Sequence, residues 1–380
     1  MFFSELGLSK PLLTHITKNN YTTPYPIQQA AIPAILSGKD VLGIAQTGSG
    51  KTLSFVLPIL QQFQAKPPAP NRCIKALILV PTRELAMQIG DVFTLFSADL
   101  PRAVKSLAVF GGVSINPQMI KLQGVEILIA TPGRLIDLMS KRAMNLSELD
   151  ILVLDEADKM LNLGFRAEMH VIFDRLPVKR QNLLFSATLG KDINTIAEIL
   201  LHNPIKIDIA PEIENLDNIK QTAYYVSEDR KGPFLRYLIK ENNMRKVLVF
   251  TSSIHKADMV VNKLKQNGIT ALALHSQKSQ GARTDALRYL KSDEIQVLVA
   301  TDLASRGIDI INLSTVINYE LPRSPKDFIH RIGRTGRAGA TGDAISFLGK
   351  EEEAHFYVIQ KKMGKRVDIL ETDDLNLRGY

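Results

Sequence analysis

The sequence predicts an α/β protein with two domains, each a mainly parallel sheet with helices on both faces. Its 380 residues exceed what one ordinary α/β domain needs and suffice for two. Short runs of β-branched and aliphatic residues recur along the chain, and a longer helical pattern follows each run. These runs are apolar throughout rather than alternating, which is typical of strands buried on both faces of a parallel sheet.

The predicted strands form two series. The first contains residues 41–44, 76–80, 104–110, 125–130, 151–154 and 182–186, and the second contains residues 246–250, 271–274, 297–300, 315–318 and 344–347. Between the series, residues 208–219 contain a proline, an acidic bias and no sustained helical periodicity. We therefore predict a first domain over residues 1–207, a linker over 208–219 and a second domain over 220–380.

Composition narrows the class of protein only moderately. The chain has 47 Lys and Arg against 39 Asp and Glu, a net charge of +8 that suits a polyanionic partner but is also common in proteins without one. The single cysteine, Cys73, excludes an intrachain disulfide and a cysteine-based zinc cluster. No apolar run approaches the roughly 20 residues of a membrane span, and residues 1–8 lack a basic signal-peptide region. We predict a cytoplasmic protein with no membrane partner.

A phosphate-binding loop is predicted directly after the first strand, where residues 45–52 read AQTGSGKT. Gly48 and Gly50 allow the backbone to curl so that its N–H groups point at phosphate oxygens, and the following helix adds its positive end. Lys51 can reach the β- and γ-phosphates, and the Thr52 hydroxyl can bind Mg²⁺. Ala45 stands where the usual motif has glycine, and a plain glycine turn before a helix is the alternative. The predicted nucleotide-binding residues here are Ala45, Gln46, Thr47, Gly48, Ser49, Gly50, Lys51 and Thr52.

An acidic pair follows the predicted strand 151–154. Carboxylates at the carboxyl end of a parallel strand lie where ligands bind in open α/β sheets. We predict that Asp155 holds the metal ion and that Glu156 orients or deprotonates the attacking water. A solvated acidic helix N-terminus is the alternative, but the phosphate loop behind another apolar strand of the same chain favours the metal site.

Arginines cluster in residues 330–337, which read HRIGRTGR. Arg334 and Arg337 are three residues apart, and both guanidinium groups could face one anion, such as the γ-phosphate. Because they belong to the predicted second domain, they would reach the phosphate only when the domains close. A plain RNA-binding patch is the alternative.

These motifs, with others in the same order, resemble those of the DEAD-box RNA helicases of superfamily 2, whose two domains are RecA-like. The resemblance runs over nearly the whole chain. Phe3, Tyr21 and residues 24–28 (PYPIQ) resemble the family's Q motif, which implies that Gln28 hydrogen-bonds the adenine edge and that Tyr21 stacks on the ring. Tyr25 and Asn20 depart from the Thr and Gly that are usual in this motif, which puts the fine tuning of ATP affinity in question.

The resemblance also implies roles for residues outside the nucleotide loop. Ser186 and Thr188 would couple the ATP state to unwinding, and Asp309 would lie near the ribose. The stretches 112–118 and 181–185 look most like the bacterial RhlE group, whose members are linked to ribosome assembly and RNA turnover. The implied RNA-binding residues are Pro81, Thr82, Arg83, Gly112, Thr131 and Arg134 in the first domain, and Thr251, Gln280, Arg283 and Thr301 in the second.

Taken with the residues, the resemblance implies an ATP-dependent RNA helicase. It would bind single-stranded RNA without sequence specificity, hydrolyse ATP with Mg²⁺ in the interdomain cleft and open short duplexes locally. Its implied catalytic residues are Lys51, Asp155, Glu156, Arg334 and Arg337. An ATP-gated RNA clamp or remodelling platform, a DNA translocase and a P-loop enzyme acting on small molecules are the alternatives. We expect a monomer that works with ribosome-assembly or RNA-decay proteins.

Overall fold

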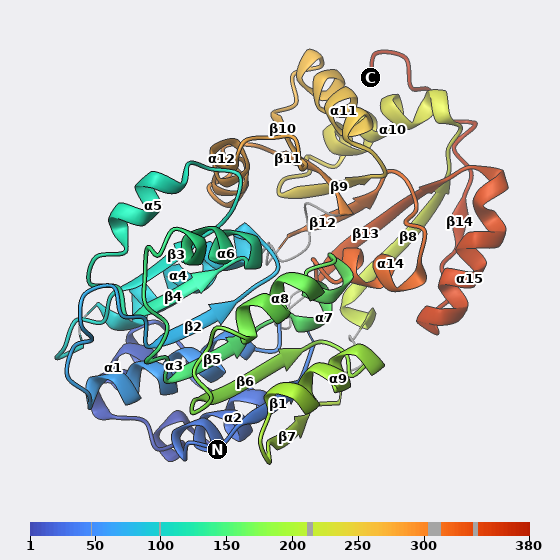
Figure 1. Cartoon of the computed structure of the whole chain (residues 1–380). Coiled ribbons are helices and arrows are strands. Elements are labelled where there is room, and N and C mark those ends of the chain that lie inside the picture. The colour runs from blue at the N-terminus through green and yellow to red at the C-terminus, as the bar shows by residue number, and fades with distance from the viewer. Residues whose placement is uncertain (47, 99, 211–215, 303–312, 337–340) are drawn as a thin grey trace. The chain divides into compact units, whose positions relative to one another are not determined.

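Two units, Met1–Pro211 and Glu212–Tyr380, make up the chain in the computed structural model (Figure 1). The structure describes every residue except 47, 99, 211–215, 303–312 and 337–340. Each unit contains a parallel seven-stranded sheet with flanking helices, so the predicted fold class is confirmed.

The sheet of the first unit has the strand order β3-β4-β2-β5-β6-β1-β7. All its strand pairings among the described residues are parallel, so every strand ends at the same edge. The central strands β1, β2, β4 and β5 are buried at every residue, as their continuous apolar runs predict. The strands are β1 (Val41–Ile44), β2 (Ala76–Leu79), β3 (Ser106–Val109), β4 (Ile127–Ala130), β5 (Ile151–Leu154), β6 (Gln181–Ser186) and β7 (Ile205–Asp208).

Two layers of helices cover this sheet. One core cluster joins α1 to α4 to one face, and another joins α6 to α9 to the opposite face. The helices of the unit are η1 (Phe3–Glu5), α1 (Lys10–Lys18), α2 (Pro26–Leu36), α3 (Lys51–Gln64), α4 (Arg83–Ser97), α5 (Ile115–Lys121), α6 (Pro132–Ser140), α7 (Ala157–Asn162), α8 (Arg166–Phe173) and α9 (Lys191–Leu200).

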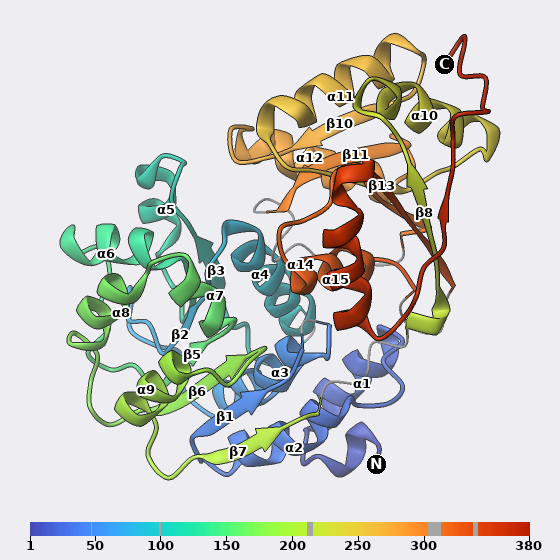
Figure 2. The ribbon, with the colours of Figure 1, turned by 90° about the vertical axis from the view of Figure 1, so that its right-hand side faces the viewer.

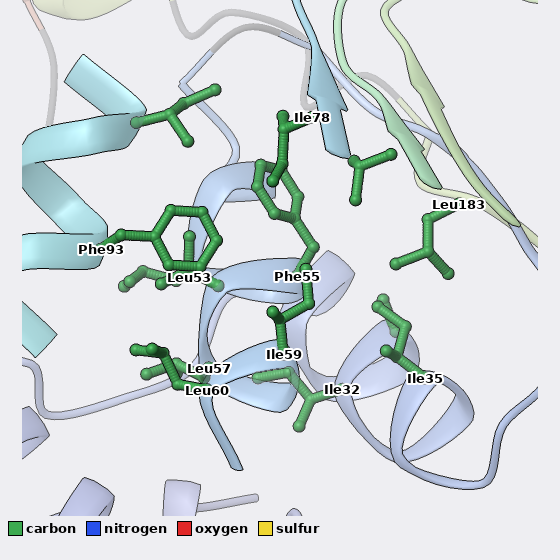
Figure 3. Packing of buried hydrophobic residues seen from close by; sticks show 14 of the residues in the cluster. Ile32, Ile35, Leu53, Phe55, Leu57, Ile59, Leu60, Ile78, Phe93 and Leu183 are labelled. Atoms are coloured by element: carbon green, nitrogen blue, oxygen red, sulfur yellow. The ribbon is translucent and has the colours of Figure 1, made fainter. Parts of the chain in front are cut away.

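Helix α3 is the centre of the first core cluster, as Figure 3 shows. Phe55 lies beneath the strands with Ile78 and Leu183 nearby, and Phe93 of α4 lies on the other side of the helix. Phe55 and Phe93 are fully buried, and burying a side chain of this size stabilises the fold by about 1.5–3 kcal/mol. The helix that follows the phosphate loop is therefore fixed on the sheet by its own apolar face.

The sheet of the second unit has the order β10-β11-β9-β12-β13-β8-β14, and its strand pairings among the described residues are also all parallel. Helices α10 and α11 pack on one face, and α12, α14 and α15 pack on the other. The strands are β8 (Ile219–Tyr225), β9 (Val247–Thr251), β10 (Ala271–Leu274), β11 (Val297–Thr301), β12 (Thr315–Asn318), β13 (Gly342–Leu348) and β14 (Ile369–Leu370). The helices are η2 (Leu216–Asn218), α10 (Glu228–Glu241), α11 (Ile254–Gln266), α12 (Gln280–Lys291), α14 (Pro325–Ile332), η3 (Lys350–Glu352) and α15 (Glu353–Met363).

Three strands were missing from the prediction: β7, β8 and β14. In β7 only Ile207 is buried, because this strand lies at the edge of its sheet. β8 mixes apolar with polar residues, and β14 has only two residues. Each therefore lacks the apolar run that marked the other strands. Strand β14 adds to the edge of the sheet beside β8.

The C-terminal segment after β14 folds back onto the second unit. Arg230 of α10 donates hydrogen bonds to the carbonyl oxygens of Thr372 and Leu375, and Arg236 donates to the terminal residue Tyr380. Figure 2 shows this segment running up to α10, with α14 and α15 side by side on the other face of the sheet. Among the helices that the structure describes, none is both long and apolar enough to cross a bilayer.

Candidate active site and nucleic-acid interface

The phosphate loop connects the end of β1 to the start of α3. Gly50 precedes the helix with φ 86°, a left-handed conformation that glycine adopts without strain. A Cβ atom at Gly50 would also lie 2.5 Å from the side-chain nitrogen of Gln28. The loop therefore needs glycine here both for its backbone angle and for the approach of Gln28. Thr47 lies outside the described residues.

Gln28 joins the N-terminal end of α2 to this loop. Its side-chain Nε2 donates to the carbonyl oxygen of Gly50 at 3.0 Å, and its Oε1 accepts from the backbone N–H of Tyr25 at 3.0 Å. Gln28 is almost fully buried. Tyr21 precedes it along the chain, is more than a third exposed, and places its ring 5.8 Å from that of Phe96. The structure thus brings Gln28 into the hydrogen-bond network of the loop.

Lys51 and the acidic pair form a buried charged group beside the loop. Lys51 donates from Nζ to the carbonyl oxygens of Ala45 at 2.6 Å and Gln46 at 2.8 Å. Burial lowers the pKa of the Lys51 ammonium, and the charges of Asp155 and Glu156 oppose that shift. Burial raises the pKa of the Asp155 carboxyl to about 6, although Lys51 acts in the opposite direction. Lys51, which follows β1, and the acids that follow β5 therefore lie close enough to shift one another's pKa.

Glu156 has one carboxylate oxygen engaged and one not. Oε1 accepts a hydrogen bond from Lys159 at 2.6 Å. Oε2 is buried and has no hydrogen-bond partner within the described part of the chain. The residue has a positive φ of 53°, a conformation that costs energy for a residue with a side chain. A buried carboxylate oxygen without a partner among the described residues can accept a hydrogen bond from water or substrate.

The end of β6 contacts both parts of this site. The backbone N–H of Ala45 donates to the carbonyl oxygen of Ser186 at 3.0 Å. The Ser186 hydroxyl donates to the carbonyl oxygen of Thr188 at 2.8 Å, and the N–H of Ala187 donates to Asp158 at 3.4 Å. Residues 186–188 therefore bridge the phosphate loop and the acidic motif. The roles of Asp158 and Lys159 were not predicted, although both lie within three residues of Glu156.

The predicted RNA residues of the first unit lie at the same sheet edge, after β2, β3 and β4. Pro81, Thr82 and Arg83 follow β2, and the Thr82 hydroxyl caps α4 by accepting from the N–H of Leu85 at 3.3 Å. Gly112 follows β3 with φ 75°, and a Cβ atom there would lie 2.1 Å from Nη2 of Arg83. The guanidinium group of Arg83 therefore packs against the bare backbone of Gly112.

Arg134 is the most deeply buried of these arginines, with 6% of its surface exposed. It lies on α6, which begins directly after Thr131, and its Nη2 donates to the carbonyl oxygen of Val113 at 2.7 Å. Its Nη1 is buried and makes no hydrogen bond to any residue that the structure describes. Nη1 of Arg134 can therefore donate a hydrogen bond to an anionic oxygen of a bound ligand.

The carboxyl edge of the first sheet is thus divided in two. Residues after β1, β5 and β6 form the loop with the lysine and the acids, and residues after β2, β3 and β4 present Arg83 and Arg134. Since β2 and β5 are neighbours, the two groups stand next to each other on one rigid sheet. The sequence predicted both sets of residues, and the strand order brings them together.

In the second unit, the predicted RNA residues also follow strand ends. Thr251 and Thr301 are the last residues of the paired strands β9 and β11. Gln280 begins α12, where neither its Oε1 nor its Nε2 has a hydrogen-bond partner among the residues described, and Arg283 follows one turn later. These positions form a second group at the carboxyl edge of a parallel sheet.

The arginine motif begins at the end of α14. Arg334 is 9% exposed and follows Gly333, the residue that caps the helix. Arg337 and Asp309, predicted to contact the γ-phosphate and the ribose, lie outside the described residues. Arg331, for which no role was predicted, is 3% exposed and binds Asp302 with two parallel hydrogen bonds.

Comparison with known families matches both units. Residues 25–196 match the DEAD/DEAH box helicase model, and residues 230–339 match the helicase conserved C-terminal domain model. The chain is 39% identical to the DEAD-box ATP-dependent RNA helicase RhpA of Helicobacter pylori, over 98% of this chain and 75% of that protein. The chain belongs to the DEAD-box ATP-dependent RNA helicases. The resemblance at family level is confirmed, and so is the predicted activity of RNA-stimulated ATP hydrolysis with RNA unwinding.

Other DEAD-box helicases match at similar levels. The ATP-dependent rRNA helicase RRP3 of Candida albicans is 38% identical over 96% of this chain and 68% of its own length. The structure of S. cerevisiae Dbp5 bound to RNA and ADP BeF3 superposes with a TM-score of 0.83 at 30% identity, covering 98% of this chain and 96% of that one. Because bacterial and fungal DEAD-box helicases match about equally, membership of the RhlE group stays a prediction.

Proposed function

We propose that this DEAD-box helicase binds ATP at the β1, β5 and β6 ends of the first unit and single-stranded RNA at the adjacent β2, β3 and β4 ends. One observation carries the proposal: both groups of side chains stand at one edge of one parallel sheet. RNA and nucleotide would then bind at neighbouring strand ends of one sheet, since β2 and β5 are paired. Dbp5, a structural relative, is known bound to RNA and ADP BeF3.

ATP is held from two sides in this proposal. Gln28 presents its amide to the adenine edge, and Tyr21 provides an aromatic face for the ring. The N–H groups of Gly48 and Gly50 and the positive end of α3 receive the phosphates. Lys51 turns from its carbonyl partners to the β- and γ-oxygens.

Asp155 and Thr52 fit a Mg²⁺ site. The Asp155 carboxylate is buried beside the loop, and the partly buried Thr52 hydroxyl lies on the first turn of α3. Within the described residues there is no group of three or more His, Cys, Asp or Glu that could form an all-protein cage. That suits Mg²⁺, which binds one or two carboxylates together with substrate phosphates. When bound, the ion would neutralise charge on the β- and γ-phosphate oxygens.

Glu156 positions the attacking water through its unpartnered Oε2, while Lys159 fixes the other carboxylate oxygen. The Glu156 carboxylate either takes the proton of that water or only accepts a hydrogen bond from it and so orients it. A positioned general base of this kind contributes roughly 10²–10⁴-fold to the rate. Arg334 and Arg337 of the second unit stabilise the charge of the transition state when the two units meet around ATP.

RNA is bound through its backbone, so recognition is independent of sequence. Arg83 and Arg134 of the first unit, with Gln280 and Arg283 of the second, contact phosphates and sugars. Residues 186–188, which contact both the loop and Asp158, relay the state of ATP to the RNA-binding part. Closure bends one strand in a way a duplex cannot follow, so short duplexes open locally.

An ATP-gated RNA clamp is the second candidate, because it would use the same residues with slow release of RNA.

We also propose the cellular process in which the helicase acts. The rRNA helicase RRP3 among the relatives favours a role in ribosome assembly, and RNA decay is the alternative. We further propose a monomer in the cytoplasm, with domains over residues 1–207 and 220–380 joined by residues 208–219.

Steady-state phosphate release tests the assignment. It is measured with no nucleic acid, with single-stranded RNA and with DNA of the same sequence, for the wild type and for Glu156→Gln. Glu148→Gln, an exposed acid paired with Lys75, is the control. We expect stimulation by RNA alone, lost in Glu156→Gln and kept in the control. Equal stimulation by DNA, or a fully active Glu156→Gln, would contradict the proposal. Unwinding of a short duplex with slow strand release would favour the clamp.

A further inference from the structure

The guanidinium group of Arg331 contacts the carboxyl ends of three neighbouring strands in the second unit. Its Nε and Nη2 donate to the two carboxylate oxygens of Asp302, directly after β11, at 2.6 and 2.7 Å. Its Nη1 donates to the side chain of Asn318, at the end of β12, at 3.1 Å, and to the carbonyl oxygen of Glu320 at 2.7 Å. Its Cζ lies 4.8 Å from the ring centroid of Phe250 in β9.

The arginine and one of its partners in this arrangement are buried from water. Arg331 is 3% exposed, and Asn318 is fully buried. A bidentate arginine–carboxylate pair fixes both position and orientation, and a cation over an aromatic face adds to it. The strands β11, β9 and β12 are consecutive in the sheet. One side chain therefore sets how these three strand ends stand relative to α14.

The proposed RNA contacts of the second unit, and its proposed contact with ATP, both lie next to the strand ends that Arg331 joins. Thr251 and Thr301, the proposed RNA contacts, are the last residues of β9 and β11. Arg334 begins the turn after α14, and its backbone N–H donates to the carbonyl oxygen of Arg331 at 3.2 Å. The connection from an RNA-contacting strand end to the arginine that faces ATP thus runs through one residue.

We propose that Arg331 is a positioning residue that couples the RNA-contacting ends of β9 and β11 to Arg334. RNA bound at Thr251 and Thr301 fixes the strand ends, and the Asp302–Arg331 pair passes this constraint to the start of the arginine turn. Arg331 itself touches neither RNA nor ATP. The inference rests on the roles proposed above for Thr251, Thr301 and Arg334.

Two variants test the coupling. Asp302→Asn removes the charge and keeps the shape, and Arg331→Lys keeps the charge but cannot make the two parallel bonds. The control is Asp293→Asn, which removes one carboxylate from the pair with Lys246 at 3.0 Å. Lys246 directly precedes β9, so this control pair lies at the opposite edge of the same sheet. Arg334→Ala is the fourth variant.

The readouts are the RNA-stimulated kcat, the RNA concentration for half-stimulation, the Kd of a fluorescent ATP analogue and amide exchange of β9, β11 and β12. For Asp302→Asn and Arg331→Lys we expect kcat to fall at least about tenfold and half-stimulation to need at least about threefold more RNA. The analogue Kd and the strand protection stay near wild type. Arg334→Ala lowers kcat without the change in RNA requirement, and Asp293→Asn changes neither.

The outcomes distinguish a failure of the proposed coupling from a failure of the proposed function. Wild-type kcat in Asp302→Asn and Arg331→Lys, with Arg334→Ala impaired, overturns the coupling alone. A fall in kcat with no change in RNA requirement also overturns it, because only Arg334 would then be displaced. Loss of strand protection in both variants makes Arg331 a fold-stabilising residue and overturns it too. An active Arg334→Ala removes Arg334 from the proposed function itself.

Discussion

The side-chain amide of Gln28 donates a hydrogen bond to the carbonyl oxygen of Gly50 at 3.0 Å. Its oxygen accepts from the N–H of Tyr25, so one buried amide ties the start of α2 to the phosphate loop. Gly50 leaves the space that Gln28 occupies, since a Cβ atom there would lie 2.5 Å from Nε2. The residue proposed to read adenine is therefore positioned by the loop proposed to hold the phosphates.

Gln28→Ala should weaken the preference for ATP over GTP. Removing the amide eliminates a purine contact and the bond to Gly50, which together cost about 1–3 kcal/mol, or roughly 10–100-fold in kcat/KM for ATP. The measurement is kcat/KM for ATP and for GTP in the presence of saturating RNA. Gln29→Ala is the control, because the side-chain amide of Gln29 donates to the carbonyl oxygen of Pro24 at 2.8 Å. An unchanged ATP-to-GTP ratio in Gln28→Ala would remove the adenine-reading role.

Gly112→Ala should weaken RNA binding and leave ATP binding intact. The added methyl group would lie 2.1 Å from Nη2 of Arg83 and would impose a positive φ on alanine. The arginine must move, and we expect a roughly tenfold weaker RNA Kd from that loss of one positioned contact. Gly111→Ala is a matched control, since a Cβ atom there meets nothing within 4 Å. Equal effects of the two substitutions on RNA Kd would mean that Arg83 is not an RNA contact.

Ser186→Ala should separate ATP hydrolysis from unwinding. The Ser186 hydroxyl donates to the carbonyl oxygen of Thr188 and accepts from its N–H, which shapes the segment between the loop and Asp158. We expect RNA-stimulated hydrolysis to stay within about threefold of wild type while unwinding of a short duplex falls at least about tenfold. Ser37→Ala, which loses a similar bond to Ala34 at the far end of α2, should change neither. Parallel losses in both assays would argue against a coupling role for Ser186.

Asp155 should make the metal-free protein less stable as pH rises. Its folded pKa of about 6 exceeds the usual 3.8, so between these values the folded state holds the extra proton. The stability it contributes is complete below about pH 4 and is lost as pH rises through about 6, by up to about 3 kcal/mol. We expect the unfolding free energy of Asp155→Asn, relative to wild type in chelator, to increase from pH 5 to pH 7.5. A constant difference would mean that Asp155 is not perturbed by burial.

Much of the fold could be read from the sequence because parallel strands buried on both faces leave continuous apolar runs. The bounds of β1, β5, β10 and β12 agree with the prediction, and β2 differs by one residue. β7, β8 and β14 could not be read, because an edge or a partly polar strand depends on its neighbour rather than on its own hydrophobicity.

The site residues could be predicted from local motifs where the chemistry requires a fixed spacing along the chain. The lysine and hydroxyl of the phosphate loop must adjoin its glycines, and the acids must end a strand, so both were predicted. Arg331 could not be singled out, because its partners come from the ends of two different strands: Asp302 follows β11, and Asn318 and Glu320 lie at the end of β12. Nor does a sequence show that Arg83 packs against Gly112 or that Glu156 leaves an oxygen unpartnered.

The sequence by itself determined the fold class, the family and which residues bear the chemistry, because these depend on local hydrophobic period and on residue order. Only the tertiary structure decided that the ATP and RNA residues divide one sheet edge between them, since this follows from the order β3-β4-β2-β5-β6-β1-β7. That order is set by packing between segments far apart in the chain, and no local pattern encodes it.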